Sequence, residues 1–340
     1  MLQKTVLLVL LIVCTVSMSA CAGSAQSAPE PTPEGTQVLA ETVRWPKEKL
    51  MLDENGVPQL KVYVLEEKAV QDMDIESYVE GVLAGEMKND WPIEALKAQA
   101  ILARTFVLKF IEDKKSRYEG ADVSTDITEA QAYSAADVND RIKQAVSETR
   151  GLVLSSDGKL PYAWFHAHSG GVTELAQTGL SWNKDEPEYT QVVKSPEPES
   201  VANAADNQAL KDAQNWTAVF PFEEFEAACS RLGVDITLNE GSKISIIRRG
   251  ESGRAQQIDV DGQTLDASEL RIALGSTKMR STLLTSLTTQ SNGSVYMAGR
   301  GYGHGVGMSQ WGAYGMAEEG KRAEEIITHY FQNIAVSRLW

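Results

Sequence analysis

Hydrophobic periodicity divides the first half of the chain into a strand followed by two helices. Residues 60–67, LKVYVLEE, alternate apolar and polar positions as a half-buried β-strand does. From Ile75 the period becomes that of an amphipathic helix, and a second helical pattern follows Pro92. The alanine-rich face of this second helix, residues 95–106, lets another element approach closely. We therefore expect an αα unit with an acidic, aromatic corner at residues 86–91.

The middle of the chain mixes helix and strand patterns. Residues 138–150 form an amphipathic helical pattern. Two strand patterns follow, residues 151–156 and residues 161–171, separated by a turn signal at Asp157 and Gly158. We predict a β-hairpin from these two strands. Residues 182–215 are acidic, contain proline and lack clear periodicity, so we expect a loop and a lobe boundary there.

The last third of the chain predicts a second, smaller lobe. Residues 220–233 have a helical pattern, and residues 244–275 predict a hairpin followed by a short helix. A glycine-rich stretch and a helix over residues 317–334 end the chain. The expected fold class is α+β, a two-lobed mixed fold with a helical corner and small β-hairpins. The main domain would span residues 56–340, with the second lobe at about 195–290.

The N-terminal segment has the layout of an export signal. Residues 1–20 carry one charge, Lys4, before an apolar run that is too short to cross a bilayer. MSAC, residues 18–21, resembles the lipobox of bacterial lipoproteins, in which the cysteine, here Cys21, is lipidated. Residues 21–55 begin with a segment rich in Pro, Ser, Gly and Glu, which predicts a flexible tether. We expect a lipid anchor at the extracytoplasmic face of the bacterial membrane; secretion without lipid, or a signal anchor, is the alternative.

Cysteine content and net charge narrow the possible disulfide bonds and the possible binding partners. Cys14 lies in the predicted signal and Cys21 in the lipobox, so only Cys229 remains for the folded part and no internal disulfide is expected. The formal net charge is −15 for the whole chain. A surface of this sign repels phosphate backbones, so nucleic acid is not an expected partner.

The glycine-rich stretch GRGYGHGVGMSQWGAYG, residues 299–315, does not match a nucleotide-binding motif. No register places a third glycine five positions after the first, as the dinucleotide fingerprint requires. The pairs Gly158-Lys159 and Gly320-Lys321 lack the Ser or Thr of a P-loop. A GxSxG nucleophile motif is absent from the sequence, and Cys229 lies in an amphipathic helical pattern typical of a buried structural thiol.

Two histidines suggest a metal site only weakly. His166 and His168 are two residues apart in a predicted strand and would point to the same face. The sequence has no HExxH motif and only four histidines. We favour hydrogen bonding in a polar groove for one or both of them, and we expect no metal; metal binding is the alternative.

Carboxylate acid–base chemistry is the remaining candidate, and it centres on Glu86. This residue lies between two predicted helices, beside Met87 and Trp91. Partial desolvation there would raise its pKa and keep the carboxyl protonated near neutral pH. The alternative is an ordinary exposed glutamate at a helix end. Lys97 and Arg104 are seven residues apart on one helix face and could hold an anionic or hydroxyl-rich substrate.

Four segments together form a specific combination of motifs. They read YVEGVLAGEMKNDWPIEALKAQAILARTFVL, WFHAHSGGVTE, SGRAQQIDVDG with LDASELRIALG, and GRGYGHGVGMSQWGAYGMAEEG. In this order, over most of the chain from about Leu60, they resemble the sporulation stage II protein D (SpoIID)/LytB family. The resemblance implies a peptidoglycan lytic transglycosylase that cleaves glycan strands lacking stem peptides and leaves 1,6-anhydro-N-acetylmuramic acid ends, in engulfment during sporulation or in cell-wall remodelling.

The resemblance also implies roles for individual residues. The glutamate of the GEM motif, Glu86, would be the catalytic acid and base, and one carboxylate suffices because the substrate's own C6 hydroxyl replaces water. Lys97 and Arg104 match supporting positions in the substrate groove. No cofactor is implied. Some relatives bind zinc near residues 124–133, but this chain has no cysteine or histidine between Arg104 and Leu160, so we expect no such site.

Further residues are expected in the groove wall, and the resemblance implies partners. We expect Ser169, Gly170, His304 and Gln310 in the groove wall. The glycines around His304 would pass close to a sugar chain or to the Glu86 corner, or form a tight crossover that packs the last helix; in the first case Tyr302 and Trp311 could face sugar rings. The implied partners are glycan strands and a SpoIIP-like amidase/endopeptidase or another autolytic amidase. The alternative function is a non-catalytic, LytB-type glycan-binding activator of such an amidase.

Overall fold

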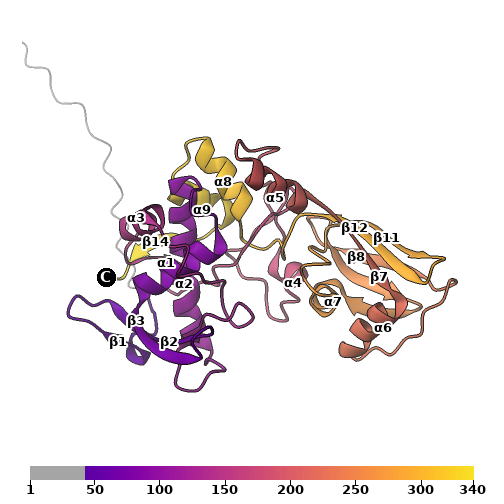
Figure 1. The fold of residues 1–340 in the computed structure, drawn as a ribbon, viewed down its shortest axis with the longest axis horizontal. Coiled ribbons are helices and arrows are strands. Elements are labelled where there is room, and N and C mark those ends of the chain that lie inside the picture. The colour runs from indigo at the N-terminus through magenta and orange to yellow at the C-terminus, as the bar shows by residue number, and fades with distance from the viewer. Residues whose placement is uncertain (1–42) are drawn as a thin grey trace, which may run out of the picture. The chain divides into compact units, whose positions relative to one another are not determined.

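The structure, a computed structural model, describes residues 43–340 and has the expected α+β composition (Figure 1). The predicted signal segment, Cys21 and the first part of the tether lie outside the described residues. Within the described part, no helix is long and apolar enough to cross a membrane. A short strand, β1 (Met51–Leu52), pairs with β2, so regular structure begins before the predicted boundary at residue 56.

A four-stranded sheet opens the described chain and leads into the helical corner. Strands β1, β2 and β3 are antiparallel neighbours, and β4 pairs in parallel with β2. Helix α1 begins directly after β3 because Asp74 caps it, accepting hydrogen bonds from the backbone N–H groups of Glu76 and Ser77. The elements here are η1 (Lys47–Lys49), β2 (Pro58–Val64), β3 (Ala69–Asp74), α1 (Ile75–Glu86), α2 (Ile93–Asp113), β4 (Val123–Ser124) and α3 (Asp140–Glu148).

The predicted hairpin over residues 151–171 is wrong. A tight turn does form at Asp157 and Gly158, but the strand before it, β5 (Leu152–Ser155), pairs with the C-terminal strand β14 (Ala335–Arg338). Pro161 cannot donate a ladder hydrogen bond, and the chain after the turn forms its next strand only at β6 (Phe165–His166). That strand pairs in parallel with β13 (Met308–Ser309), from the glycine-rich stretch.

The C-terminal third differs from its prediction in helix number. Where the pattern predicts one helix over residues 317–334, the structure has α8 (Gln310–Glu318) and α9 (Ala323–Tyr330), separated at Gly320 with φ +82°. A helix, α5 (Ala204–Gln214), also forms within residues 182–215, which the sequence pattern assigns to a loop. The remaining elements are α4 (Ala176–Gly179), α5 (Ala204–Gln214), β7 (Asn215–Pro221), α6 (Phe222–Arg231), β8 (Ile244–Arg249), β9 (Ala255–Val260), β10 (Gln263–Asp266), α7 (Ala267–Leu274), β11 (Leu284–Gln290) and β12 (Ser294–Arg300).

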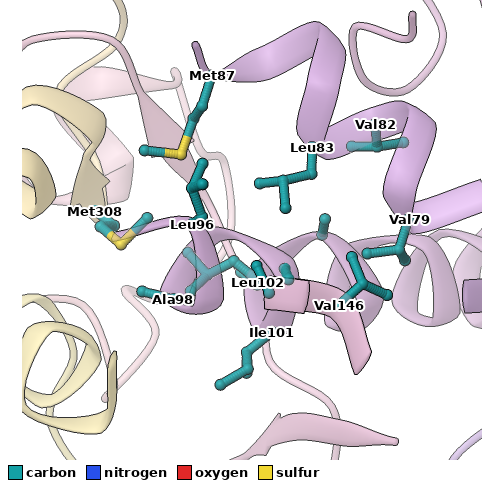
Figure 2. Packing of buried hydrophobic residues seen from close by; sticks show 14 of the residues in the cluster. Val79, Val82, Leu83, Met87, Leu96, Ala98, Ile101, Leu102, Val146 and Met308 are labelled. Atoms are coloured by element: carbon teal, nitrogen blue, oxygen red, sulfur yellow. The ribbon is translucent and has the colours of Figure 1, made fainter. Parts of the chain in front are cut away.

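Two hydrophobic cores organise residues 43–340. The first is built around α2, which contacts α1, α3, α8, α9 and β5. The alanines of α2 are fully buried, and neighbouring elements approach this helix closely as predicted. Figure 2 shows Leu83 of α1 and Leu96 of α2 in this core, with Met308 nearby. The second core lies between helices α6 and α7 and two three-stranded sheets, whose strand orders are β10-β9-β8 and β11-β12-β7. Both Glu86 and Met308 thus belong to segments anchored on the first core.

Candidate active site

The position of Glu86 follows from how α1 ends. Glu86 is the last residue of α1, because the backbone turns extended at Met87, and α2 starts after Pro92. The α1 surface on the preceding turns carries Gly81 and Gly85, and a β-carbon at Gly85 would lie 2.5 Å from the backbone N of Tyr133. The segment around Tyr133 can therefore pack directly against α1, beside Glu86.

This packing determines the environment of the Glu86 carboxyl. Ala132 N–H donates to Glu86 Oε1 at 2.7 Å, and Gln310 Nε2 donates to Oε2 at 3.4 Å. Burial raises the pKa of Glu86, and the two hydrogen bonds oppose that shift only in part. A glutamate with a raised pKa keeps its proton at higher pH than usual, and the same two donors stabilise the carboxylate once the proton is lost. The group can therefore act as an acid and then as a base.

Glu86 faces a pocket of about 380 Å³. The wall combines aromatic, amide and imidazole side chains with one arginine, and among the described lining residues Glu86 is the one carboxylate. A second carboxylate, which a glycosidase that activates water would need, is therefore not provided by these residues. The lining residues are Glu86, Phe106, Ile127, Ala130, Gln131, Trp164, Phe165, His166, Ala167, Arg271, Gly303, His304 and Gln310.

An aromatic cleft of about 470 Å³ adjoins this pocket, and the two share Phe106 and Trp164 as wall residues. Tyr162 and Trp164 stack with ring centroids 5.1 Å apart, and Trp182 packs edge-on against both. Flat aromatic surfaces beside an acid–base group suit the apolar faces of sugar rings. Trp311, which the sequence offered as an aromatic residue that could face sugar rings, has a different position. It is buried against Trp91, with ring centroids 4.5 Å apart.

The glycine-rich stretch brings His304 and Gln310 to the pocket by crossing the 164–168 segment at close range. Gly303, Gly305 and Gly307 all have positive φ angles. A β-carbon at Gly303 would lie 2.6 Å from His166 Cβ, and one at Gly307 would collide with the carbonyl oxygen of Trp164. The sequence left two alternatives for these glycines: passage close to a sugar chain or to the Glu86 corner, or a tight crossover. The close contacts at Gly303 and Gly307 are those of a tight crossover, which ends with Gln310 beside Glu86.

The histidines are neutral groups of the wall. Burial and the charges of Arg271 and Arg254 lower the pKa of His304 to about 3, and its Nδ1 accepts a hydrogen bond from Val306 N–H at 3.0 Å, which leaves the proton on Nε2. Burial also lowers the pKa of His166, whose Nδ1 lies 3.1 Å from Val306 O. Within residues 43–340 no group of three or more His, Cys, Asp or Glu side chains is arranged to hold a metal.

His168 does not share the pocket wall with His166. Its Nδ1 accepts a hydrogen bond from Gly170 N–H at 2.9 Å and lies 3.5 Å from a carboxylate oxygen of the buried Glu197. Ser169, fully buried, donates its N–H to Glu197 at 2.5 Å, and Gly170 packs against Leu283. The Ser169–Gly170 segment, which the sequence analysis assigns to the groove wall, is thus not among the residues that line the Glu86 pocket.

Lys97 and Arg104 are also outside the Glu86 pocket. Lys97 forms ion pairs with Glu94 and Glu148. Arg104 is fully buried, and its Nη2 lies 2.5 Å from Glu76 Oε2. The expectation that Arg104 faces a substrate therefore needs correction, because all of its surface is covered by protein.

Gln131, Trp164 and Arg271 are three of the pocket residues that the sequence reasoning missed. Gln131 comes from a loop without periodicity, Trp164 belongs to a segment read as half of a hairpin, and Arg271 lies on α7, in a different core from Glu86. A usable signal existed for two of them, because Trp164 and Arg271 fall within the four motifs. Spacing in the sequence does not reveal that these motifs meet at one pocket.

Comparison with known proteins shows which family the chain belongs to. The family model described as SpoIID, stage II sporulation protein, matches residues 64–155, and a domain of unknown function (DUF8618) matches residues 176–307. Stage II sporulation protein D of Bacillus amyloliquefaciens is 31% identical over 289 residues, covering 81% of this chain and 78% of that protein. An uncharacterised protein of Brachyspira hyodysenteriae is 33% identical over 78% of this chain and 67% of its own length. The amidase enhancer of Bacillus subtilis is 25% identical over 74% of this chain and 39% of its own length. This chain belongs to the SpoIID/LytB family.

Proposed function

We propose that this protein is a peptidoglycan lytic transglycosylase that cleaves glycan strands lacking stem peptides. The observation that carries the proposal is the Glu86 pocket: one carboxyl with a raised pKa, two hydrogen-bond donors on it, and no second carboxylate among the described lining residues. Relatives named stage II sporulation protein D and amidase enhancer support a cell-wall role, in sporulation or in wall remodelling.

The chemistry needs one group that first gives and then takes a proton. Protonated Glu86 donates its proton to the glycosidic oxygen on C1 of N-acetylmuramic acid, and the C1–O bond breaks with both electrons going to that oxygen. The C6 hydroxyl oxygen of the same sugar bonds to C1, and its proton passes to the Glu86 carboxylate. The product is a 1,6-anhydro end, no water is consumed, and Glu86 returns to its protonated form.

The surrounding residues support each stage of this reaction. The carboxylate formed after the first proton transfer is stabilised by Ala132 N–H and Gln310 Nε2, which already lie on its two oxygens. The aromatic cleft at Tyr162, Trp164 and Trp182 would hold a neighbouring sugar and so fix the strand relative to Glu86. A peptidoglycan amidase, SpoIIP-like or another autolysin, is the class of enzyme that must remove stem peptides to supply this substrate.

The test is product analysis on peptide-free strands. The purified full chain should release fragments with 1,6-anhydro ends, detected by mass spectrometry, and Glu86→Gln should abolish them. Glu318→Gln is the matched control, since Glu318 is an exposed glutamate at the end of α8. The second candidate is a non-catalytic activator, which the amidase enhancer relative favours. It would be established if the wild-type protein forms no anhydro ends, yet the wild type and the Glu86→Gln variant accelerate an added amidase equally.

We also propose that Cys21 carries a lipid that holds the protein at the outer face of the membrane. The support is the lipobox-like MSAC sequence after an apolar segment of signal length. Cys21→Ala should move the protein from the membrane fraction to the soluble fraction without changing glycan cleavage. Retention of this variant in the membrane fraction would indicate a signal anchor instead.

A further inference from the structure

Arg271 is a buried cation in the wall of the Glu86 pocket. It lies on α7, is 8% exposed, and lines the pocket that contains Glu86 and His304. Its Nε donates to the carbonyl oxygen of Arg280 at 3.0 Å. Burial lowers its pKa to about 10, so the guanidinium remains charged at neutral pH. Within residues 43–340, no carboxylate lies within ion-pairing distance of it and no protein acceptor is hydrogen-bonded to its two Nη groups.

Two other buried arginines differ from Arg271 in the partners of their Nη groups. Arg104 is neutralised by Glu76, and the Nη groups of Arg254 donate to the carbonyl oxygens of Val172 and Ser169 at 3.0 and 2.6 Å. The Nη groups of both arginines therefore have partners within the fold, although Arg254 Nε is buried without one. The Nη groups of Arg271 are not among the buried, unpartnered side-chain atoms of the described chain, so they remain accessible, and because Arg271 lines the pocket they can bind an anion there.

The rest of the pocket suits a sugar whose ring is uncharged and which carries one anionic substituent. Burial lowers the pKa values of His166 and His304, so both imidazoles are uncharged at neutral pH, and burial raises the pKa of Glu86. Gln131 has both amide atoms buried without a hydrogen-bond partner in the described protein. Arg271 is thus the strong positive charge of this wall, and its planar Nη groups match a carboxylate geometrically.

Stem-peptide removal creates such a carboxylate on the proposed substrate. N-acetylmuramic acid carries a lactyl group whose carbonyl is an uncharged amide while the stem peptide is attached. An amidase converts that amide to a free carboxylate. We propose that Arg271 binds this lactyl carboxylate and thereby selects glycan strands from which stem peptides have been removed. This inference rests on the proposed function, because it assigns a residue to the recognition of that substrate.

The experiment measures binding rather than cleavage, in a Glu86→Gln background of the full chain. Three tetrasaccharides are compared by calorimetry: the peptide-free form with free lactyl carboxylates, the same sugar with the carboxylates converted to carboxamides, and the form with stem peptides attached. A fourth ligand, a chitin tetrasaccharide, lacks the lactyl group altogether. Protein with Arg271 should bind the carboxylate form about 10- to 100-fold more tightly than the carboxamide form.

Variants then assign the preference to Arg271. Arg271→Gln should abolish the preference for the carboxylate, Arg271→Lys should retain part of it, and binding of the chitin tetrasaccharide should be equal in all three proteins. Arg248→Gln is the matched control, because Arg248 is exposed on β8. Thermal unfolding shows whether each variant is folded.

Two outcomes would overturn the inference. One is equal binding of the carboxylate and carboxamide sugars by protein with Arg271, a result that needs no variant and so holds even where Arg271→Gln fails to fold. The other is a parallel loss of carboxylate, carboxamide and chitin binding in folded Arg271→Gln, which would indicate a structural role. Failure of the proposed function is a separate result. If the wild type forms no anhydro ends but the preference for the carboxylate sugar is intact, Arg271 recognises glycan in a protein that does not cleave it.

Discussion

Replacement of Arg104 by methionine should destabilise the protein without altering glycan recognition directly. Arg104, a residue of α2, is fully buried. Its Nε and Nη2 donate to Glu76 Oε2 at 3.2 and 2.5 Å, and its Nη1 donates to the Leu152 carbonyl oxygen at 2.9 Å. The other oxygen of Glu76 accepts from Gly151 N–H at 3.0 Å and from Trp340 Nε1 at 2.9 Å. This network connects α1, α2, β5 and the C-terminal residue.

The magnitude follows from what the substitution leaves behind. Methionine fills a similar volume, so the main loss is the ion pair, and Glu76 becomes a buried charge without a cation. Removing one partner of a buried pair costs about 3–5 kcal/mol in unfolding free energy. The two donors that remain on Glu76 Oε1 partly stabilise its charge, which favours the lower end of this range. The double variant Glu76→Gln/Arg104→Met also lacks the buried carboxylate charge, and the side-chain oxygen of the introduced glutamine can still accept the hydrogen bonds from Gly151 N–H and Trp340 Nε1. The double variant should therefore be more stable than Arg104→Met alone.

The assay is denaturant unfolding of the full chain, followed by binding of peptide-free glycan at a temperature where the variants are folded. Folded Arg104→Met should bind glycan with near wild-type affinity, since no part of this side chain is exposed. The reasoning would be refuted by wild-type stability together with lost glycan binding. That result would place Arg104 on the substrate, as the family resemblance implies.

The remaining predictions concern the Glu86 pocket and the crossover that builds it. Because the pKa of Glu86 is raised, formation of anhydro ends should persist to higher pH than for an ordinary glutamate and fall as pH rises through that pKa; a pH profile of initial rates measures this. Protonation of Glu86 also adds to the free energy of unfolding. This contribution is complete below the pKa of Glu86 in the unfolded chain and is lost as pH rises through its higher pKa in the folded protein. The free energy of unfolding of Glu86→Gln should therefore depend less on pH than that of the wild type in this window. Gln310→Ala removes a donor that lowers the pKa of Glu86, so the profile should shift to higher pH, and an unchanged profile would contradict the assignment. Gly307→Ala should destabilise the fold by more than about 2 kcal/mol, because φ is +70° there and the added carbon would strike the Trp164 carbonyl; wild-type unfolding would disprove the close crossing.

Local pattern was sufficient for the elements that depend on neighbouring residues. The 3.6-residue periods after Ile75 and Pro92 predicted α1 and α2. The position of Glu86 between them left two alternatives open, a partly desolvated carboxyl and an exposed helix-end glutamate, and the structure shows a buried carboxyl. The family motifs placed His304 and Gln310 in the groove wall, and both line the Glu86 pocket, whereas Ser169 and Gly170, expected in the same wall, do not. Helix caps, turn residues and hydrophobic periods act over a few positions, so the sequence by itself determines them.

Only the tertiary structure decided which distant segments meet. β5 pairs with β14 rather than with the strand after its turn, and Arg104 points to Glu76 in the core rather than to a substrate. Arg271 reaches the Glu86 pocket from α7, a helix far along the chain from α1. Strand partners and the direction of a long side chain depend on competition between contacts far apart in sequence, and that competition is resolved only when the hydrophobic cores pack.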